Sequence, residues 1–347
     1  KRTVTLDLNG HVLKYESANK GSVIVVDGGG QLTIEDSNTS NLSHKFKPND
    51  DGLWVSDENG KETVTGGVIT GGTGYPILLY GSYYYDGGGV YIASGGQLTM
   101  TGGNIVGCTA EDGGGVCLEG SNGTVPFTMT GGSIAGCVAS GIGGGVRASG
   151  TFKMSGKAVI RSCTVKSTTQ LICGGGIYVD GSFEMSGEAK IEGCQAISNS
   201  SKGGGVHLSN NTEFTLSGNA VIQNCKAVNS VNPGETYGGG VSADCMRQIT
   251  LEGNASIAGC TAANGSGLYI TGSWISGDGN LYANGGSVDG DVVLENDGPC
   301  TITGSGGTVF NGKVTVTPDS TIEKGTFNGE VINNGTCLLY TSPSPRD

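Results

Sequence analysis

The chain has 347 residues, of which 67 are Gly, 35% are hydrophobic and 14% are charged, and its formal net charge is -12. Gly at this density excludes long helices, because each Gly inside a helix costs about 1 kcal/mol relative to Ala. The acidic charge argues against binding to nucleic acid or to an anionic membrane surface, and no apolar run approaches the roughly 18 residues that a membrane span needs.

Both ends of the sequence predict a fragment of a longer protein. Residue 1 is Lys, with no signal-peptide pattern after it, so we expect the natural start to lie upstream. Residues 337–347, CLLYTSPSPRD, resemble the translation of a transposase-adapter sequence from short-read library preparation. We expect this segment to be an artefact and leave it out of the fold prediction.

Residues 1–86 are predicted to form the first coils of a repeat structure. They contain TVTLDLNGHVLKY and SVIVVDGGGQLTIEDS, in which apolar and polar residues alternate. A period of two is typical of a half-buried strand. Residues 64–72, VTGGVITGG, match a corner and a strand of the repeats that follow.

A stretch that starts with a Gly triplet returns throughout residues 87–272. The six clear copies start at Gly87, Gly113, Gly143, Gly174, Gly203 and Gly238, and a weaker copy starts at Gly265. They recur every 26 to 35 residues. Fixed-period self-similarity on this scale is typical of a solenoid.

Each copy predicts three short strands separated by Gly-rich or Asn-rich corners. In the first copy the inward residues are Val90 and Ile92, then Leu98 and Met100, then Ile105. One copy cannot bury its apolar face alone, but stacked copies form a continuous core. We therefore predict an all-β fold, a parallel β-helix built by a single chain with about three strands per coil. The crossover rule favours the right-handed form.

Residues 273–336 predict shorter and more polar coils. They contain GGSVDGDVVLENDG, GGTVFNGKVTVT and GTFNGEVINNGT. No linker in the sequence marks a second independent domain.

The repeat resembles a known class of β-helix. The pattern GGGVYI, then F-x-M-S-G, then I-x-x-C-x-A is similar to the pectin-lyase-like repeats of large bacterial surface proteins. It also resembles the polymorphic outer membrane protein repeat, whose halves are GG[AV]I and FxxN, although Phe152 and Phe183 are followed by Ser where that family has Asn. The resemblance implies a β-helix that is exported from a bacterium and works outside the cell or at its surface.

Cysteines occur at one equivalent position of the repeat: Cys108, Cys137, Cys163, Cys194, Cys225 and Cys260. Metal binding or redox chemistry is one interpretation of this column. However, no CxxC pair and no nearby His supplies a zinc-like spacing. We favour small inward residues that fill the core, and we predict neither a metal site nor a cofactor. Cys117, Cys173 and Cys245 break the column, and we expect them nearer the surface.

A second column is predicted to face outward from the strand after the triplet: Tyr91, Cys117, Arg147, Tyr178, His207, Ser242 and Tyr269. Tyr91 and Tyr178 could stack on sugar rings, and Arg147 could hold a carboxylate. The simpler interpretation is that alternate strand positions hold residues that tolerate solvent.

Carboxylates could make the same face an enzyme site. Glu119, Asp180 and Asp244 share an equivalent position on alternate coils, roughly 9–10 Å apart for neighbouring members. Arg147 and His207 complete this catalytic alternative. Asp86 and Asp112 precede successive triplets and are predicted to be neighbours. The NTD, DD, GHG and R-x-K set of β-helix polygalacturonases is missing, so we favour ordinary turn and strand-end acids.

A tyrosine cluster precedes the first full repeat and is the strongest candidate contact surface: Tyr75, Tyr80, Tyr83, Tyr84 and Tyr85. Loops that leave a rigid scaffold are common binding sites, and aromatic residues suit glycans or protein partners. The alternative is that these tyrosines cover exposed core.

Three functions remain open on the sequence alone. The first is a non-catalytic surface protein, an adhesin or its stalk, that binds glycans or host and matrix proteins. The second is a carbohydrate-active β-helix enzyme, a polysaccharide lyase or glycoside hydrolase. The third is a phage or secreted spike, for which a trimer is expected. The sequence leaves the oligomeric state open.

Overall fold

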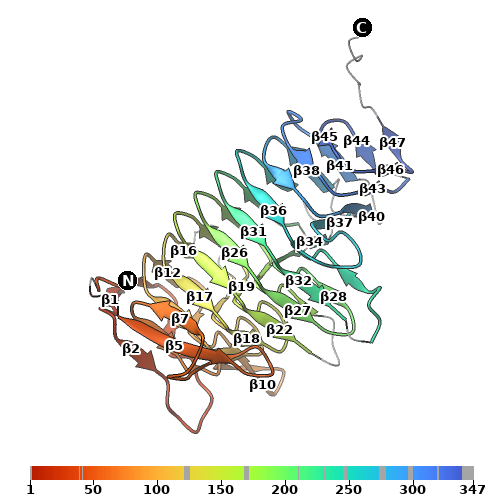
Figure 1. The fold of residues 1–347 in the computed structure, drawn as a ribbon. Coiled ribbons are helices and arrows are strands. Elements are labelled where there is room, and N and C mark those ends of the chain that lie inside the picture. The colour runs from red at the N-terminus through yellow and green to blue at the C-terminus, as the bar shows by residue number, and fades with distance from the viewer. Residues whose placement is uncertain are drawn as a thin grey trace.

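A computed structural model describes residues 2–38, 40, 42–120, 126–167, 172–209, 211–229, 231–244, 248–272, 279–295, 300–318 and 320–337. It is a rod of stacked coils with the two ends of the chain at opposite ends (Figure 1). The described residues form strands and turns only, which confirms the prediction of an all-β parallel β-helix. No helix in these ranges is long and apolar enough to span a membrane.

Three long parallel sheets, here called A, B and C, form the walls of the rod, and each coil contributes one strand to each of them. In stacking order, sheet A consists of β1 (Arg2–Asp7), β4 (Gly30–Glu35), β12 (Gln97–Met100), β16 (Phe127–Met129), β20 (Thr151–Met154), β25 (Ser182–Met185), β30 (Glu213–Leu216), β35 (Gln248–Leu251), β38 (Gly279–Ala283), β41 (Cys300–Thr303), β44 (Thr321–Ile322) and β47 (Thr336–Cys337). Sheet B consists of β2 (Val12–Lys14), β8 (Val68–Thr70), β13 (Asn104–Val106), β17 (Ser133–Ala135), β21 (Val159–Arg161), β26 (Lys190–Glu192), β31 (Val221–Gln223), β36 (Ser256–Ala258), β39 (Ser287–Val288), β42 (Val309–Phe310) and β45 (Thr326–Phe327). Sheet C consists of β3 (Ile24–Val26), β11 (Val90–Ile92), β15 (Val116–Leu118), β19 (Val146–Ala148), β24 (Ile177–Val179), β29 (Val206–Leu208), β34 (Val241–Asp244), β37 (Leu268–Thr271), β40 (Val292–Glu295), β43 (Val314–Val316) and β46 (Val331–Asn333).

The pairing register confirms the predicted inward columns. Phe127, Phe152, Phe183 and Phe214 pair in register along sheet A and are buried. Their ring centroids lie 4.6, 5.1 and 5.0 Å apart in turn, with the rings nearly parallel. Equivalent residues of successive copies therefore stack directly on one another, which is how the repeat makes its core.

The Gly triplet is a steric requirement of this stacking. Gly143 has a φ of +65° and turns the chain into sheet C. A Cβ on Gly144 would lie 2.3 Å from the carbonyl oxygen of Gly175 in the next coil and 2.5 Å from the carbonyl of Thr164. Because backbone presses on Gly144 from two directions, no larger residue fits there.

The six column cysteines are buried inside the rod, which confirms their predicted inward position. Their thiols lie near backbone carbonyls; Cys163 Sγ, for example, is 3.4 Å from the carbonyl oxygen of Arg161. Burial raises the pKa of the Cys163, Cys194 and Cys225 thiols, so they stay protonated and pack as apolar groups.

Two further sheets run along one side of the rod. The side sheet consists of β14 (Thr109–Ala110), β18 (Val138–Ala139), β22 (Thr164–Lys166), β27 (Gln195–Ile197) and β32 (Lys226–Val228), and the cover sheet of β23 (Ile172–Cys173), β28 (Ser201–Lys202) and β33 (Thr236–Tyr237). A small second core lies between them, with Val165, Ile172 and Ala196 fully buried.

The prediction that the column after the triplet faces solvent is wrong for most of its members, and the cover strands are one reason. Tyr237 of the cover sheet contacts the ring of Tyr269 at 4.8 Å, and Lys202 reaches Asp244. Along this column Tyr91, Cys117, His207, Ser242 and Tyr269 are buried rather than solvent-facing. Tyr91 lies under Tyr75, and Cys117 lies beside Arg147. The expectation that Cys117 and Cys173 lie near the surface is also wrong, since both are buried, Cys117 beside Arg147 and Cys173 within the cover strand β23. Cys245 lies outside the described residues.

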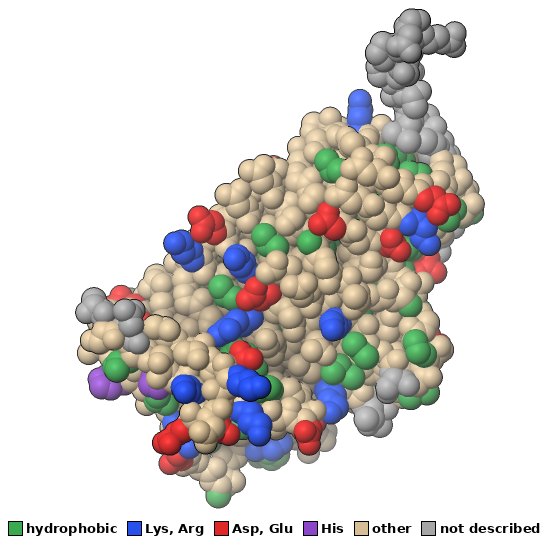
Figure 2. Space-filling model, in the orientation of Figure 1, with side chains coloured by type: hydrophobic (Ala, Val, Ile, Leu, Met, Phe, Trp, Pro, Cys, Tyr) green, Lys and Arg blue, Asp and Glu red, His purple; other side chains and the backbone are tan. Residues whose placement is uncertain are grey.

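Two excursions leave the coils near the N-terminus. The first is an antiparallel sheet of β5 (Ser43–Pro48), β6 (Trp54–Ser56) and β7 (Glu62–Thr65), whose Phe46, Trp54 and Val64 pack on the outside of sheet B. The second is an antiparallel hairpin of β9 (Tyr75–Leu79) and β10 (Ser82–Asp86). On the face shown in Figure 2, acidic and basic side chains lie among one another, and no large area of one charge is seen.

Candidate functional site

The candidate site lies where the β9–β10 hairpin returns to the first Gly triplet. Tyr80 and Gly81 at the hairpin tip have φ values of +52° and +82°. Positive φ at both central residues suits a type I′ turn, the turn that matches the twist of a two-residue hairpin. At the hairpin base Tyr75 stacks on Tyr91 of sheet C, with ring centroids 4.7 Å apart. This stack holds the hairpin against the rod.

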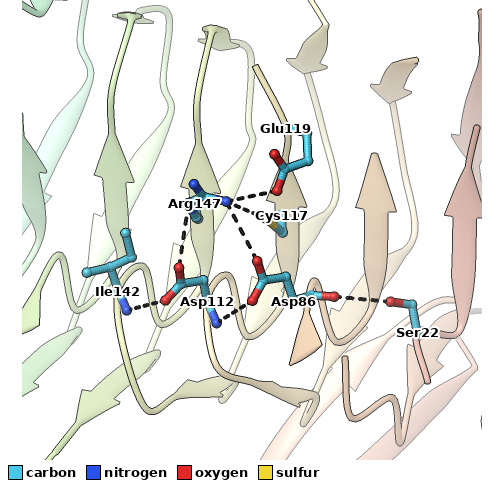
Figure 3. Close-up of polar contacts among 7 residues, drawn as sticks. All are labelled: Ser22, Asp86, Asp112, Cys117, Glu119, Ile142 and Arg147. Atoms are coloured by element: carbon cyan, nitrogen blue, oxygen red, sulfur yellow. Dashed lines mark hydrogen bonds and ion pairs between the residues drawn. The ribbon is translucent and has the colours of Figure 1, made fainter. Parts of the chain in front are cut away.

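Three carboxylates from the two preceding coils converge on Arg147 of β19 (Figure 3). Arg147 Nη1 lies 3.1 Å from Glu119 Oε1 and 3.7 Å from Asp86 Oδ2, and Nε lies 3.7 Å from Asp112 Oδ2. The backbone N–H of Asp112 donates to Asp86 Oδ1 at 3.2 Å, and that of Ile142 donates to Asp112 Oδ1 at 2.9 Å. The predicted proximity of Asp86 and Asp112 is thus confirmed.

The cluster contains three acidic side chains and one basic side chain, and the pKa values of two of the acids are raised. Burial, and then the neighbouring charge of Asp112, raise the pKa of the Asp86 carboxyl to about 7. Burial also raises the pKa of Asp112. Arg147 cannot lose its proton in a protein. Near neutral pH the cluster therefore holds a partly protonated Asp86 carboxyl beside the Arg147 guanidinium.

Asp86, Cys117 and Glu119 are close enough to share a metal ion, since one ligand atom of each lies within 4.8 Å of the others. All three, however, face the same nitrogen: Arg147 Nη1 is 3.5 Å from Cys117 Sγ and also contacts both carboxylates. Burial raises the pKa of the Cys117 thiol, which opposes the thiolate that a metal prefers. Arg147 therefore takes the position that a cation would need.

A hollow of about 560 Å³ opens beside the cluster. Leu79 and Tyr84 of the hairpin form one wall, and Asp86, Asp112 and Arg147 form the floor. Glu111, Ser140 and Gly141 complete the lining. The site thus combines an apolar, aromatic wall with an acidic floor.

The five residues of the catalytic alternative are not brought together. Glu119 contacts Arg147, whereas Asp180 follows β24 and is exposed. His207 is buried and lies with Nδ1 2.7 Å from Ser242 Oγ; burial lowers its pKa to about 4, so the ring is neutral near pH 7. Asp244 pairs with Lys202 at 2.6 Å. Sheet C thus carries two separate charged clusters, with Asp180 between them.

The predicted binding tyrosines fall into two groups. Tyr80, Tyr83 and Tyr84 are exposed on the hairpin, and Tyr75 is partly exposed. Lys20 Nζ lies 4.1 Å from the centroid of the half-buried Tyr85 ring. On sheet C, Tyr91 lies beneath Tyr75, and Tyr178 lies 5.4 Å from the His207 ring.

Sequence reasoning did not assign several residues of the site. Leu78 and Leu79 are exposed on the hairpin, and Glu111 lines the hollow. The alternation of GYPILLYGSYYYD around a short turn could have indicated the hairpin and its leucines. The contact of Lys202 with Asp244 was not predicted: each cover strand ends directly before a Gly triplet, but no apolar alternation marks these two-residue strands or shows that they fold over sheet C.

Comparison with protein-family models, curated proteins and solved structures gives no match to this chain. Support for the fold therefore comes from the structure, and support for a function comes from the residues of the candidate site.

Proposed function

We propose that this chain is part of a non-catalytic, exported β-helix protein of the bacterial surface or its surroundings, an adhesin or a stalk that presents binding elements. The β9–β10 hairpin carries the proposal. Leu78, Tyr80 and Tyr83 are 59, 103 and 60% exposed, and with Tyr75, Leu79 and Tyr84 they place six exposed large apolar side chains on this one hairpin. Exposed apolar surface grouped at one place is typical of an interaction site. The resemblance of the repeat to pectin-lyase-like surface proteins supports the same proposal.

The state of the charged groups supports binding rather than catalysis. Arg147 is engaged by three carboxylates, and His207 is buried and neutral. Neither is free to act on a substrate in the arrangement seen here.

The test is binding of the full chain to immobilised matrix proteins and to a panel of neutral and acidic glycans. Replacing Tyr80, Tyr83 and Tyr84 together with Ser is expected to reduce binding at least tenfold, because exposed aromatic anchors carry most of the energy of an interface. The control is Val231→Ser, which removes a 76% exposed apolar side chain from another loop. Equal binding by the triple variant, or no binding by the wild type, would refute the proposal.

One observation favours an enzyme as the second candidate. Asp86, with a pKa of about 7, lies beside Asp112 at the floor of an open hollow, so a proton donor and a carboxylate are neighbours. A lyase or hydrolase would release unsaturated products or reducing ends from acidic polysaccharides. Asp86→Asn should then abolish release, with Glu188→Gln as the control, an exposed acid at the corner between β25 and β26. No release by the wild type excludes this candidate.

A further inference from the structure

The two faces of the β9–β10 hairpin have different surroundings, since one borders the hollow and the other does not. Register places Leu79, Tyr84 and Asp86 on one face, because Ser82 pairs with Leu79 and Tyr84 with Ile77. This face includes the walls of the hollow. Leu78 and Tyr83 pair with each other and lie on the opposite face. Of the two hairpin faces, only the one that carries Leu79 and Tyr84 borders the hollow. These two side chains are 48 and 43% exposed.

The hollow carries an excess of negative charge. Asp86, Glu111 and Asp112 line it, and among the described residues of its lining Arg147 is the only basic one. Arg147 is already shared with Glu119, so its charge is more than offset. The nearby Lys166, at the adjoining hollow that also includes Ser140, is paired with Asp51 at 2.8 Å. The acidic residues of the hollow therefore outnumber the basic groups that could neutralise them, which favours binding of a cation.

An anionic ligand does not fit this arrangement. A uronic acid or a sulfated sugar would place its charge against Asp86, Glu111 and Asp112, and the chain as a whole carries a formal charge of -12. The guanidinium that could hold such a group is occupied by carboxylates. Like-charge contact of this kind disfavours binding and slows association.

We propose that the hollow and the Leu79–Tyr84 face bind a basic segment of a partner protein, with a Lys or Arg side chain in the hollow and a neighbouring apolar residue against Leu79 and Tyr84. The ammonium or guanidinium group would lie against the carboxylates of the hollow, and the face of the Tyr84 ring could contact it as well. Apolar contact would supply affinity, and charge would supply selectivity. This inference rests on the proposed binding function and names the partner's chemistry.

The test uses the full chain and a short fluorescein-labelled peptide of Lys-Leu pairs separated by Gly. Its counterpart carries Glu in place of each Lys, and polygalacturonate serves as the anionic sugar probe. We expect the Lys peptide to bind at low salt near neutral pH, the Glu peptide to bind at least tenfold more weakly, and added salt to weaken the Lys complex.

Variants locate the contact. Leu79→Ser with Tyr84→Ser is expected to weaken binding of the Lys peptide about tenfold, as loss of an anchor does. Glu111→Gln, which leaves the contacts of Arg147 in place, is expected to weaken it about threefold, as for a partly exposed ion pair. Val231→Ser and Glu188→Gln lie on other coils and serve as the matched apolar and acidic controls.

The outcomes separate this inference from the proposed function. Preference for the Glu peptide or for polygalacturonate, or failure of the Lys peptide to bind, overturns the inference. If a matrix protein or glycan binds and Leu78→Ser with Tyr83→Ser abolishes that binding while Leu79→Ser with Tyr84→Ser does not, the hairpin still binds but this inference is wrong. If nothing binds to the hairpin at all, both fail.

Discussion

The regular coils and the β9–β10 hairpin use the same residue types in opposite ways. In the coils aromatic side chains are internal: Phe152 and Phe183 stack in register and have no exposed surface. In the hairpin Tyr80 and Tyr83 project into solvent, whereas Tyr75 and Tyr85 hold the hairpin to the rod through Tyr91 and Lys20. The difference teaches that stability in this protein comes from columns repeated across coils, whereas the places free to vary and to bind are the segments that leave the coils.

The largest effect is expected from breaking an internal column. Phe183→Ala removes a ring that contacts Phe152 and Phe214 on both sides, with centroid distances of 5.1 and 5.0 Å. The free energy of unfolding should fall by about 4 kcal/mol, as for other buried Phe to Ala changes. Urea unfolding followed by far-UV circular dichroism measures it. A loss below about 1 kcal/mol would mean that the column is not a main source of stability.

The next effect concerns the triplet. Gly144→Ala brings a Cβ within 2.3 Å of backbone in the next coil, so the coils must separate locally. We expect a loss of about 3 kcal/mol, the upper range for overpacking. Gly193→Ala is the comparison, because Gly193 has a φ of +63° but its nearest neighbour is 3.7 Å away, and a loss of about 1 kcal/mol is expected from backbone strain. Equal losses would show that the close contact with the next coil is not what requires Gly at position 144.

A smaller effect is expected from the charged cluster at the hairpin base. The pKa of Asp86 is about 7 in the folded chain and ordinarily 3.8, so between these values the folded state holds a proton that the unfolded state has lost. The stability that this proton contributes is fully present below about pH 4 and is lost as the pH rises through 7.

Asp86→Asn mimics the protonated carboxyl and has no proton to lose. The Tm of the wild type relative to this variant should therefore fall between pH 4 and pH 8, by about 3 °C, which corresponds to roughly 1 kcal/mol in a chain of this size. Thermal melts at several pH values supply the measurement. A constant difference, or a rise with pH, would show that Asp86 is ionised throughout.

The smallest effect on stability is expected on the hairpin surface. Leu78→Ser with Tyr83→Ser changes two exposed side chains of the outer face. The free energy of unfolding should stay within about 0.5 kcal/mol of wild type, as for other surface changes. Chemical denaturation checks this. A loss above about 2 kcal/mol would mean that the hairpin supports the rod and is not mainly a presenting element.

Much of the fold could be predicted from the sequence, and most of the site could not. Val90, Val116 and Val146 were expected at one inward position, and they pair directly. Arg147 was expected in a solvent-facing column, but it lies in a charged cluster with Asp86 and Asp112 from the two preceding coils. His207 was a catalytic alternative, yet the structure buries it against Ser242. The errors concern only what covers the outer face of sheet C.

The sequence by itself determined the coil, its three strands and the register between coils. Alternation with a period of two selects the inward face, and identical neighbours stack best in register. The tertiary structure alone decided which segments fold back over that coil. The hairpin and the cover strands occupy intervals of irregular length between repeats, and their contacts, such as Tyr75 on Tyr91 and Lys202 on Asp244, join residues that no period relates. The candidate binding site is made by those contacts, because it forms where an irregular excursion meets the regular rod.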